Sequence, residues 1–158
     1  MTFSPYERML YVSRRRDSIV STLRVNADGS LYPIGELSTS SGACYLSTDR
    51  SGRYLLSAYY AEGGVAVRRI RDDGIAFGPR LCWINTGIGA HSIETDALNR
   101  YVFSCNIAEP DGSNAIHQFL FDERSGKLTA NSPARLIGEN GCGPRHFCFH
   151  PRLMIVFL

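Results

Sequence analysis

The sequence repeats itself, and this repeat constrains the fold more than any other feature. The segment GACYLSTDRSGRYLLSAYY, residues 42–60, returns as GAHSIETDALNRYVFSCN, residues 89–106, and in altered form as GPRHFCFHP, residues 143–151. The arginine that precedes the second strand of a unit stands at positions 8, 53 and 100. A period of about 45 residues is typical of architectures in which each unit packs on its neighbours.

Each unit divides into short strands separated by glycine-rich turns. Strands are expected at 9–13, 19–25 and 31–37 in the first unit, at 44–48, 54–60, 65–70 and 81–84 in the second, and at 92–95, 101–106, 115–121 and 134–137 in the third. The loop from Ile107 to Asn114 is longer than its counterparts, which a repeat array tolerates. No segment shows the 3.6-residue apolar period of a helix.

Four short strands per unit at this period indicate propeller blades rather than a helical repeat. We therefore predict an all-β fold, a β-propeller of four-stranded antiparallel blades, with about three blades in this chain. Blade units are expected at roughly 1–41, 42–88 and 89–142, and a further blade is expected to start in 143–158. Together they form one partial propeller domain over residues 1–158.

Composition excludes several classes of protein. The chain has 158 residues and a net charge of +2, which is too small to indicate nucleic-acid binding. No apolar run reaches the roughly 20 residues that a membrane helix needs, and no signal peptide is visible, so neither nucleic acid nor membrane is an expected partner. The five cysteines form no CxxC pair, which favours reduced thiols in a cytoplasmic protein.

One basic cluster stands out, the run Arg14-Arg15-Arg16 between two expected strands. The simpler interpretation is a solvated turn that connects these strands. The alternative is a rim of the fold that attracts anions. The sequence leaves both interpretations open.

Aligning the units by their glycines predicts which residues converge. In a propeller the first strand of each blade lines the central channel. Residues that follow the repeated glycines should therefore lie side by side at one mouth of that channel. The alignment gives one position shared by Cys44, His91 and Arg145, and a next position shared by Tyr45, Ser92 and His146.

His91, Arg145 and His146 are the candidate catalytic residues. An imidazole can activate water at neutral pH, and a guanidinium can bind an anion or stabilise a developing oxyanion. For each histidine the alternative is a hydrogen-bonded structural role. If its strand is regular, His146 points to the opposite face from Arg145.

The other polar candidates are expected to be structural. His117 lies in an outer strand, and His150 stands at the turn that Asp49 and Asp96 occupy in the earlier units. Glu94 and Asp96 are expected to cap turns rather than to take part in catalysis. The HExxH, clustered-cysteine and EF-hand spacings are absent, so neither a metal nor another cofactor is expected.

The motifs GAHSIETD, DxxGRYLLSAYY and GPRHFCFHP resemble the seven-bladed propeller lactonase family, over nearly the whole chain from Ser4 to Pro151. The best-known activity in this family is that of 6-phosphogluconolactonase, and a related branch cyclises carboxymuconates. The resemblance implies that His91, in the GxHS strand, and Arg145, in the GPRH motif, are active-site residues. His146 belongs to the same GPRH motif. The implied substrate is a small anionic sugar lactone.

The chain departs from the family pattern in its length. The resemblance implies about seven blade units, of which this chain holds roughly three, so we expect a fragment truncated at both ends. The family also has an Asn-Glu pair after its FHP motif, whose Glu completes the active site, whereas this sequence stops at Leu158 before such a pair. Three blades leave two apolar faces bare, which predicts self-association through open blade edges.

Three functions are compatible with these observations. The first is a metal-independent sugar-lactone hydrolase, and the second is a cyclase or isomerase that uses the same residues on the same scaffold. The third is a non-catalytic propeller that binds a protein partner, because one fold serves many functions.

Overall fold

The computed structural model describes residues 1–6, 8–107, 113–139, 141–153 and 155–158. The expected long loop Ile107–Asn114 lies mostly outside these residues. The described residues form strands and turns, and none of them is helical. The prediction of an all-β fold is therefore confirmed. No described segment forms a helix that could cross a membrane.

Three four-stranded antiparallel sheets follow one another along the chain. The first contains β1 (Thr2–Phe3), β2 (Met9–Arg14), β3 (Ile19–Val25) and β4 (Leu31–Ser38). The second contains β5 (Tyr45–Thr48), β6 (Tyr54–Tyr59), β7 (Gly64–Ile70) and β8 (Ala76–Asn85). The third contains β9 (Ala90–Thr95), β10 (Tyr101–Asn106), β11 (Ala115–Asp122) and β12 (Lys127–Ile137). A hairpin of β13 (Cys148–Phe149) and β14 (Val156–Phe157) comes last.

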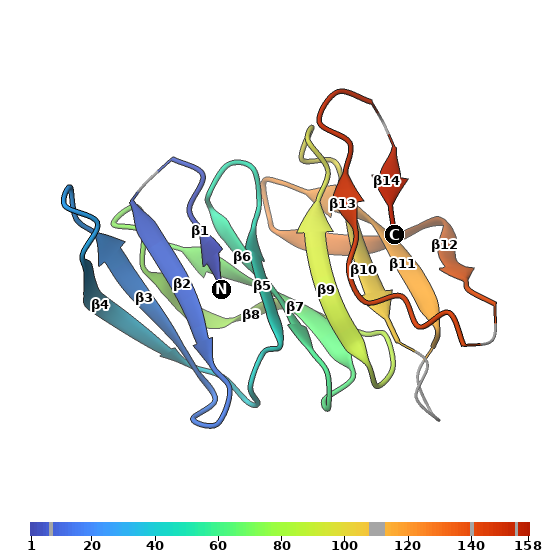
Figure 1. Cartoon of the computed structure of the whole chain (residues 1–158), viewed down its shortest axis with the longest axis horizontal. Helices are drawn as coiled ribbons and strands as arrows, with labels where there is room; N and C mark the ends of the chain where they lie inside the picture. Colours follow the sequence, from blue (N-terminus) through green and yellow to red (C-terminus); the bar gives the residue numbers. More distant parts are fainter. Residues whose placement is uncertain (7, 108–112, 140, 154) are drawn as a thin grey trace.

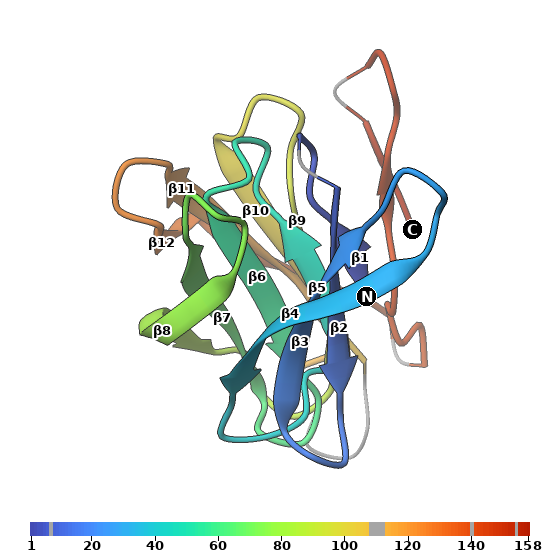
Figure 2. The same cartoon turned by 90° about the vertical axis from the view of Figure 1, so that its left-hand side faces the viewer.

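The sheets have the arrangement of propeller blades. Each one pairs its strands in sequence order, and the sheets stand side by side from blue through green to orange in Figure 1. Figure 2 turns the first sheet towards the viewer. The first strands of successive sheets lie next to one another, since β1 contacts β5 and β5 contacts β9. The chain thus contains three four-stranded blades, as predicted, followed by a two-stranded hairpin.

The outer strands β8 and β12 are longer than the predicted strands at 81–84 and 134–137. Each pairs with its inner neighbour through a register shift, which falls between Val67 and Arg69 for β8 and between His117 and Phe119 for β12. A bulge of this kind interrupts the two-residue alternation of a strand. The bulge of β8 contains Gly78-Pro79 and that of β12 contains Ser132-Pro133, which are turn residues in a sequence pattern. The predicted strands therefore cover only the part beyond these residues.

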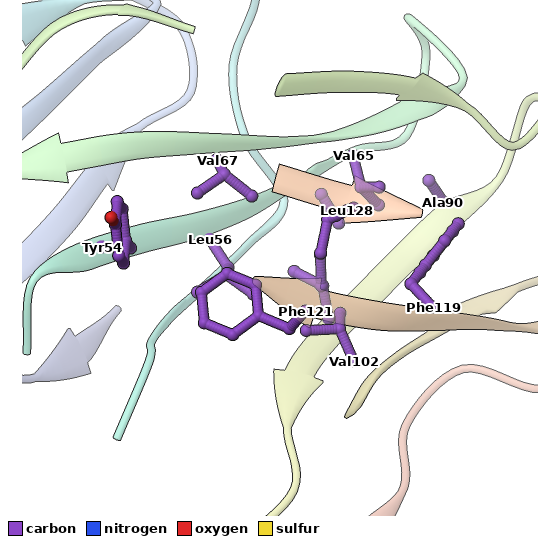
Figure 3. Packing of buried hydrophobic residues seen from close by; sticks show 11 residues of the cluster. Tyr54, Leu56, Val65, Val67, Ala90, Val102, Phe119, Phe121 and Leu128 are labelled. Carbon is purple, nitrogen blue, oxygen red and sulfur yellow. The ribbon is translucent and has the colours of Figure 1, made fainter. Parts of the chain in front are cut away.

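The middle sheet packs on both of its neighbours. Every residue of β6 is buried. Leu56 packs with Val102 and Phe121 of the third sheet (Figure 3), whereas Leu55 packs in a second cluster with Tyr11 of the first sheet. Successive side chains of a strand point to opposite faces, so one continuous apolar strand supplies both cores. This packing fixes the position of the inner strands relative to one another.

Candidate active site

The hairpin registers place the three glycine-led segments in equivalent positions. The last pairs of the three inner hairpins are Thr48–Leu55, Thr95–Val102 and Phe149–Val156. In each of the three, six residues of the sequence separate the two members of the pair. Counting back from these pairs, Cys44, His91 and Arg145 each lie four residues before the last residue of the inner strand. The ladders thus agree with the alignment made from the sequence.

Three rings meet where the inner strands begin. The ring centroids of His91 and His146 are 4.8 Å apart, with the planes at 82°. The ring of His146 lies 6.0 Å from that of Tyr45. The strand β13 starts only at Cys148, so the strand alternation that would turn His146 away from the site does not extend to it. The structure therefore brings both predicted histidines together.

The environment of His91 favours its neutral form. Its Nδ1 atom is buried and has no hydrogen-bond partner among the described residues, which leaves Nε2 as the ring nitrogen for a water molecule. Burial lowers the pKa of the imidazole from the usual 6.5, and the positive charges of His146, Arg145 and Arg15 lower this pKa further. A neutral imidazole at physiological pH can accept a proton.

Arg145 supplies an uncompensated positive charge beside this imidazole. It is exposed and forms no ion pair with any described residue. Together with His146 it lines a groove of about 720 Å³, whose apolar walls include Ile116, Leu136, Ile137 and Leu158. His91 does not line this groove. A free guanidinium next to a proton acceptor is suited to an anion or to a developing oxyanion.

Glu94 does not cap a turn, and the prediction for this residue is wrong. Its carboxylate accepts a hydrogen bond from the hydroxyl of Tyr45, across the contact between β5 and β9. Burial, followed by this hydrogen bond, raises the pKa of Tyr45. Asp96 does cap the turn, since it accepts bonds of 2.7 Å from the N–H groups of Arg100 and Tyr101. Glu94 lies within the strand, so its side chain reaches the neighbouring blade instead.

His150 and His117 make the structural contacts expected of them. The Nδ1 atom of His150 accepts hydrogen bonds from the N–H groups of Arg152 and Leu153, at 3.0 and 2.9 Å. The Nε2 atom of His117 lies 3.0 Å from the Ser113 hydroxyl, and its ring is parallel to that of Phe119. Both rings are therefore held by neighbours that are close in sequence.

The thiol in the position equivalent to His91 has a structural role. Cys44 Sγ donates to the carbonyl of Ala90 at 3.1 Å, and burial raises the pKa of this thiol, which opposes the thiolate form that a nucleophile requires. All five cysteines are free. Among the described residues, no three His, Cys, Asp or Glu side chains are placed to hold a metal ion.

Tyr60 is a site residue that the sequence analysis missed. Its ring meets the ring of His91 edge-on at 6.2 Å, and its carbonyl accepts a 3.0 Å hydrogen bond from the N–H of Gly89. Tyr60 directly follows the second strand of its own blade. The repeat could reveal this residue, because the position after the second strand of one unit contacts the glycine that begins the next unit.

The described sheets form part of a β-propeller, and two histidines and an arginine lie where its inner strands begin. The model of the seven-bladed β-propeller lactonase family matches residues 1–158. The chain therefore belongs to this lactonase family.

Several proteins of known name are similar to it. The 6-phosphogluconolactonase of Pectobacterium carotovorum is 35% identical over 152 residues, which cover 96% of this chain and 44% of the relative. The corresponding protein of Cronobacter sakazakii is 33% identical with the same coverage. A solved structure, the periplasmic gluconolactonase of Pseudomonas aeruginosa, superimposes with a TM-score of 0.80 at 24% identity, over 95% of this chain and 47% of the other. The chain thus spans less than half the length of these relatives.

Proposed function

We propose that this chain takes part in the hydrolysis of a sugar lactone, a reaction of the 6-phosphogluconolactonase type. Membership of the lactonase family and the names of its relatives support the reaction class. The observation that carries the proposal is the half-buried imidazole of His91, which has a depressed pKa and lies against His146 near an unpaired Arg145. This set can activate water next to a group that stabilises negative charge.

In the proposed mechanism, Nε2 of neutral His91 accepts a proton from water, and the hydroxide adds to the lactone carbonyl carbon. Arg145 stabilises the oxyanion that forms on the carbonyl oxygen. When the tetrahedral intermediate collapses, the bond between the carbonyl carbon and the ring oxygen breaks. The protonated imidazole returns its proton to the leaving alkoxide, so lactone and water give one hydroxy acid. His146 holds the His91 ring by its edge-on contact at 4.8 Å.

The test is hydrolysis of a phosphorylated sugar lactone by this chain and by its variants. We expect His91→Ala and Arg145→Ala each to lower kcat/KM by about two orders of magnitude or more. Arg24→Ala, an exposed arginine on the outer part of the first sheet, is the control. Near-normal rates in both site variants would overturn the assignment. Conversion of a carboxymuconate in place of the lactone would identify a cyclase.

The pH dependence of the same assay tests the role of His91. The folded protein lowers the pKa of His91 below 6.5, so the imidazole is neutral above that value and becomes protonated as the pH falls below it. Activity should therefore be constant above about pH 7 and decrease on the acid side with an apparent pKa under 6.5. A decrease that begins well above pH 7 on acidification would contradict this role.

We also propose that the chain is cytoplasmic and that it associates with itself through its outermost blades. Its five free thiols support a reducing compartment. Exposed apolar residues at both ends of the array support the association; Tyr32 is 63% exposed, Ile137 is 68% exposed and Leu158 is 72% exposed. Sedimentation velocity should reveal dimers or larger species at micromolar concentration. A monodisperse monomer with a sharp calorimetric transition would refute the association.

A further inference from the structure

Tyr60 has an equivalent in the first sheet, and that equivalent is an arginine. Tyr60 directly follows β6 and lies against the entry to the inner strand of the third sheet. Arg15 directly follows β2. The two hairpins end in equivalent pairs, Tyr59–Gly64 and Arg14–Ile19. Arg15 and Tyr60 therefore occupy the same position in successive blades.

Arg15 also lies against the inner strand of the blade that follows its own. A Cβ atom on Gly42 would be 2.3 Å from the carbonyl oxygen of Arg15 and 2.6 Å from its Cα atom. The absence of a side chain on Gly42 is what lets the turn approach so closely. Gly42 is two residues before Cys44, as Gly89 is two residues before His91. In both blades the residue that follows the second strand lies against the glycine segment of the next blade, and this residue carries a guanidinium in the first blade and a phenol in the second.

The charge of Arg15 is left uncompensated, unlike that of Arg14. Arg14 pairs with Asp17 at 3.3 Å and with Glu36 at 3.1 Å. Arg15 is exposed and has no carboxylate partner among the described residues. Its field reaches His91, whose pKa is lowered first by burial, then by the charges of His146 and Arg145, and also by Arg15.

A hollow of about 420 Å³ adjoins Arg15. It is lined by Arg15, Arg16, Ser41, Gly42 and Ala61, and so contains two cations and no carboxylate. The hydroxyl of Ser41 is held by a 2.6 Å hydrogen bond to Glu62, which fixes the loop that forms one wall. A hollow of this size and charge accommodates a phosphate or carboxylate group.

We propose that Arg15 binds the distal anionic group of the lactone, a phosphate ester or a carboxylate, while Arg145 stabilises the oxyanion at the carbonyl. This assignment rests on the proposed lactonase function. Arg15 comes from the first sheet, His91 from the third, and Arg145 from the segment before β13. Arg15 therefore binds the negative charge at the distal end of the substrate, and Arg145 stabilises the charge that develops on the carbonyl oxygen. Arg15 determines substrate charge specificity and takes no part in proton transfer.

The first test compares a charged and an uncharged lactone. With Arg15→Gln we expect KM for 6-phosphoglucono-lactone to increase about tenfold, since a charged hydrogen-bonded contact is lost, while KM for glucono-lactone changes less than about twofold. Arg15→Lys should recover part of the loss. Arg24→Gln removes the same charge from the same sheet and should leave both lactones unaffected. Equal effects of Arg15→Gln on the two lactones would overturn the proposal. A carboxylated lactone in the same series distinguishes the two anion chemistries.

The second test does not require turnover. In the 158-residue chain, 6-phosphogluconate and uncharged glucose are titrated while the NMR signals of the His91 ring are followed. We expect 6-phosphogluconate to shift these signals in the parent chain and in Arg24→Gln, and to bind about tenfold more weakly in Arg15→Gln. The pKa of His91, which also faces His146, Arg145, Tyr60 and Cys44, should rise in Arg15→Gln alone. If the chain hydrolyses no lactone but shows this binding pattern, the proposed function fails and the anion site stands. Binding that is unchanged in Arg15→Gln overturns the anion site.

Discussion

The two ends of the inner strands differ in how faithfully the repeat is kept. At the turn end, equivalent positions have the same role. Each residue there accepts hydrogen bonds from backbone N–H groups of its own turn; these residues are Asp49, Asp96 and His150. At the other end, Cys44, His91 and Arg145 also occupy one position, yet they share neither chemistry nor contacts.

The turn end is also tied together across blades. Asn99 donates to the carboxylate of the buried Asp49 at 2.9 Å, and its amide oxygen accepts from the N–H of Arg50 at 3.0 Å. The Arg50 guanidinium donates to the carbonyl of Thr95 at 2.9 Å. Equivalent positions that keep the same contact thus indicate scaffold, whereas equivalent positions with different contacts indicate a place where chemistry can be installed. The predictions below test this distinction.

The largest effect is expected for Asp49→Ala. Asp49 is fully buried and accepts from the N–H groups of Ser51 and Tyr54 and from the Asn99 amide, so its removal leaves buried donors without acceptors. We expect a loss of about 3 kcal/mol in the free energy of unfolding, measured by urea denaturation. The equivalent Asp96→Ala, at a more exposed turn, should cost about 1 kcal/mol. Equal costs would mean that the bond across blades contributes nothing.

The next effect concerns activity rather than stability. His91→Cys installs at the third blade the residue that the second blade carries at the equivalent position. We expect kcat/KM for a phosphorylated lactone to decrease at least about 100-fold, which corresponds to about 2.7 kcal/mol, because the residue no longer has an imidazole to accept the proton. The melting temperature should change by no more than roughly 3 °C. A large loss of stability with little loss of rate would reverse the roles assigned to the two ends.

Tyr45→Phe tests a hydrogen bond between blades that begins at the first residue of β5. The change removes the hydroxyl that donates to Glu94 and leaves a carboxylate without its partner at the contact between blades. We expect the free energy of unfolding to fall by about 1 to 2 kcal/mol. The double variant Tyr45→Phe, Glu94→Leu should recover part of this loss. If the double variant is the less stable of the two, the cost does not come from the unpaired carboxylate.

The smallest effect is expected where one turn residue replaces another. His150→Asp puts the residue of the first two turns into the third, where it can accept from the same backbone N–H groups. We expect a change within about 0.5 kcal/mol, whereas His150→Ala should cost about 1 kcal/mol. Chemical denaturation of the three proteins side by side measures both values. A costly His150→Asp would show that this turn is not interchangeable with the other two.

The sequence by itself determined the four-stranded sheets and the register of their inner strands. These follow from local chemistry: turn residues such as Asp49 and Asp96 recur at a fixed spacing, and the apolar pattern between them is that of strands. Because the register depends on local features, the sequence also predicted that Cys44, His91 and Arg145 occupy equivalent positions in successive blades. The full extent of β8 and β12 did not follow, since Gly78-Pro79 and Ser132-Pro133 stand within these strands and are residues typical of turns.

Only the tertiary structure decided which side chains meet across blades. The contact of His146 with His91, the hydrogen bond of Tyr45 to Glu94 and the position of Arg15 over Gly42 each join residues that are about 25 to 55 positions apart. Such contacts depend on the twist and spacing of stacked sheets and on where a strand begins. A repeat in the sequence fixes equivalent positions, but the packing of one blade on the next determines what each position faces.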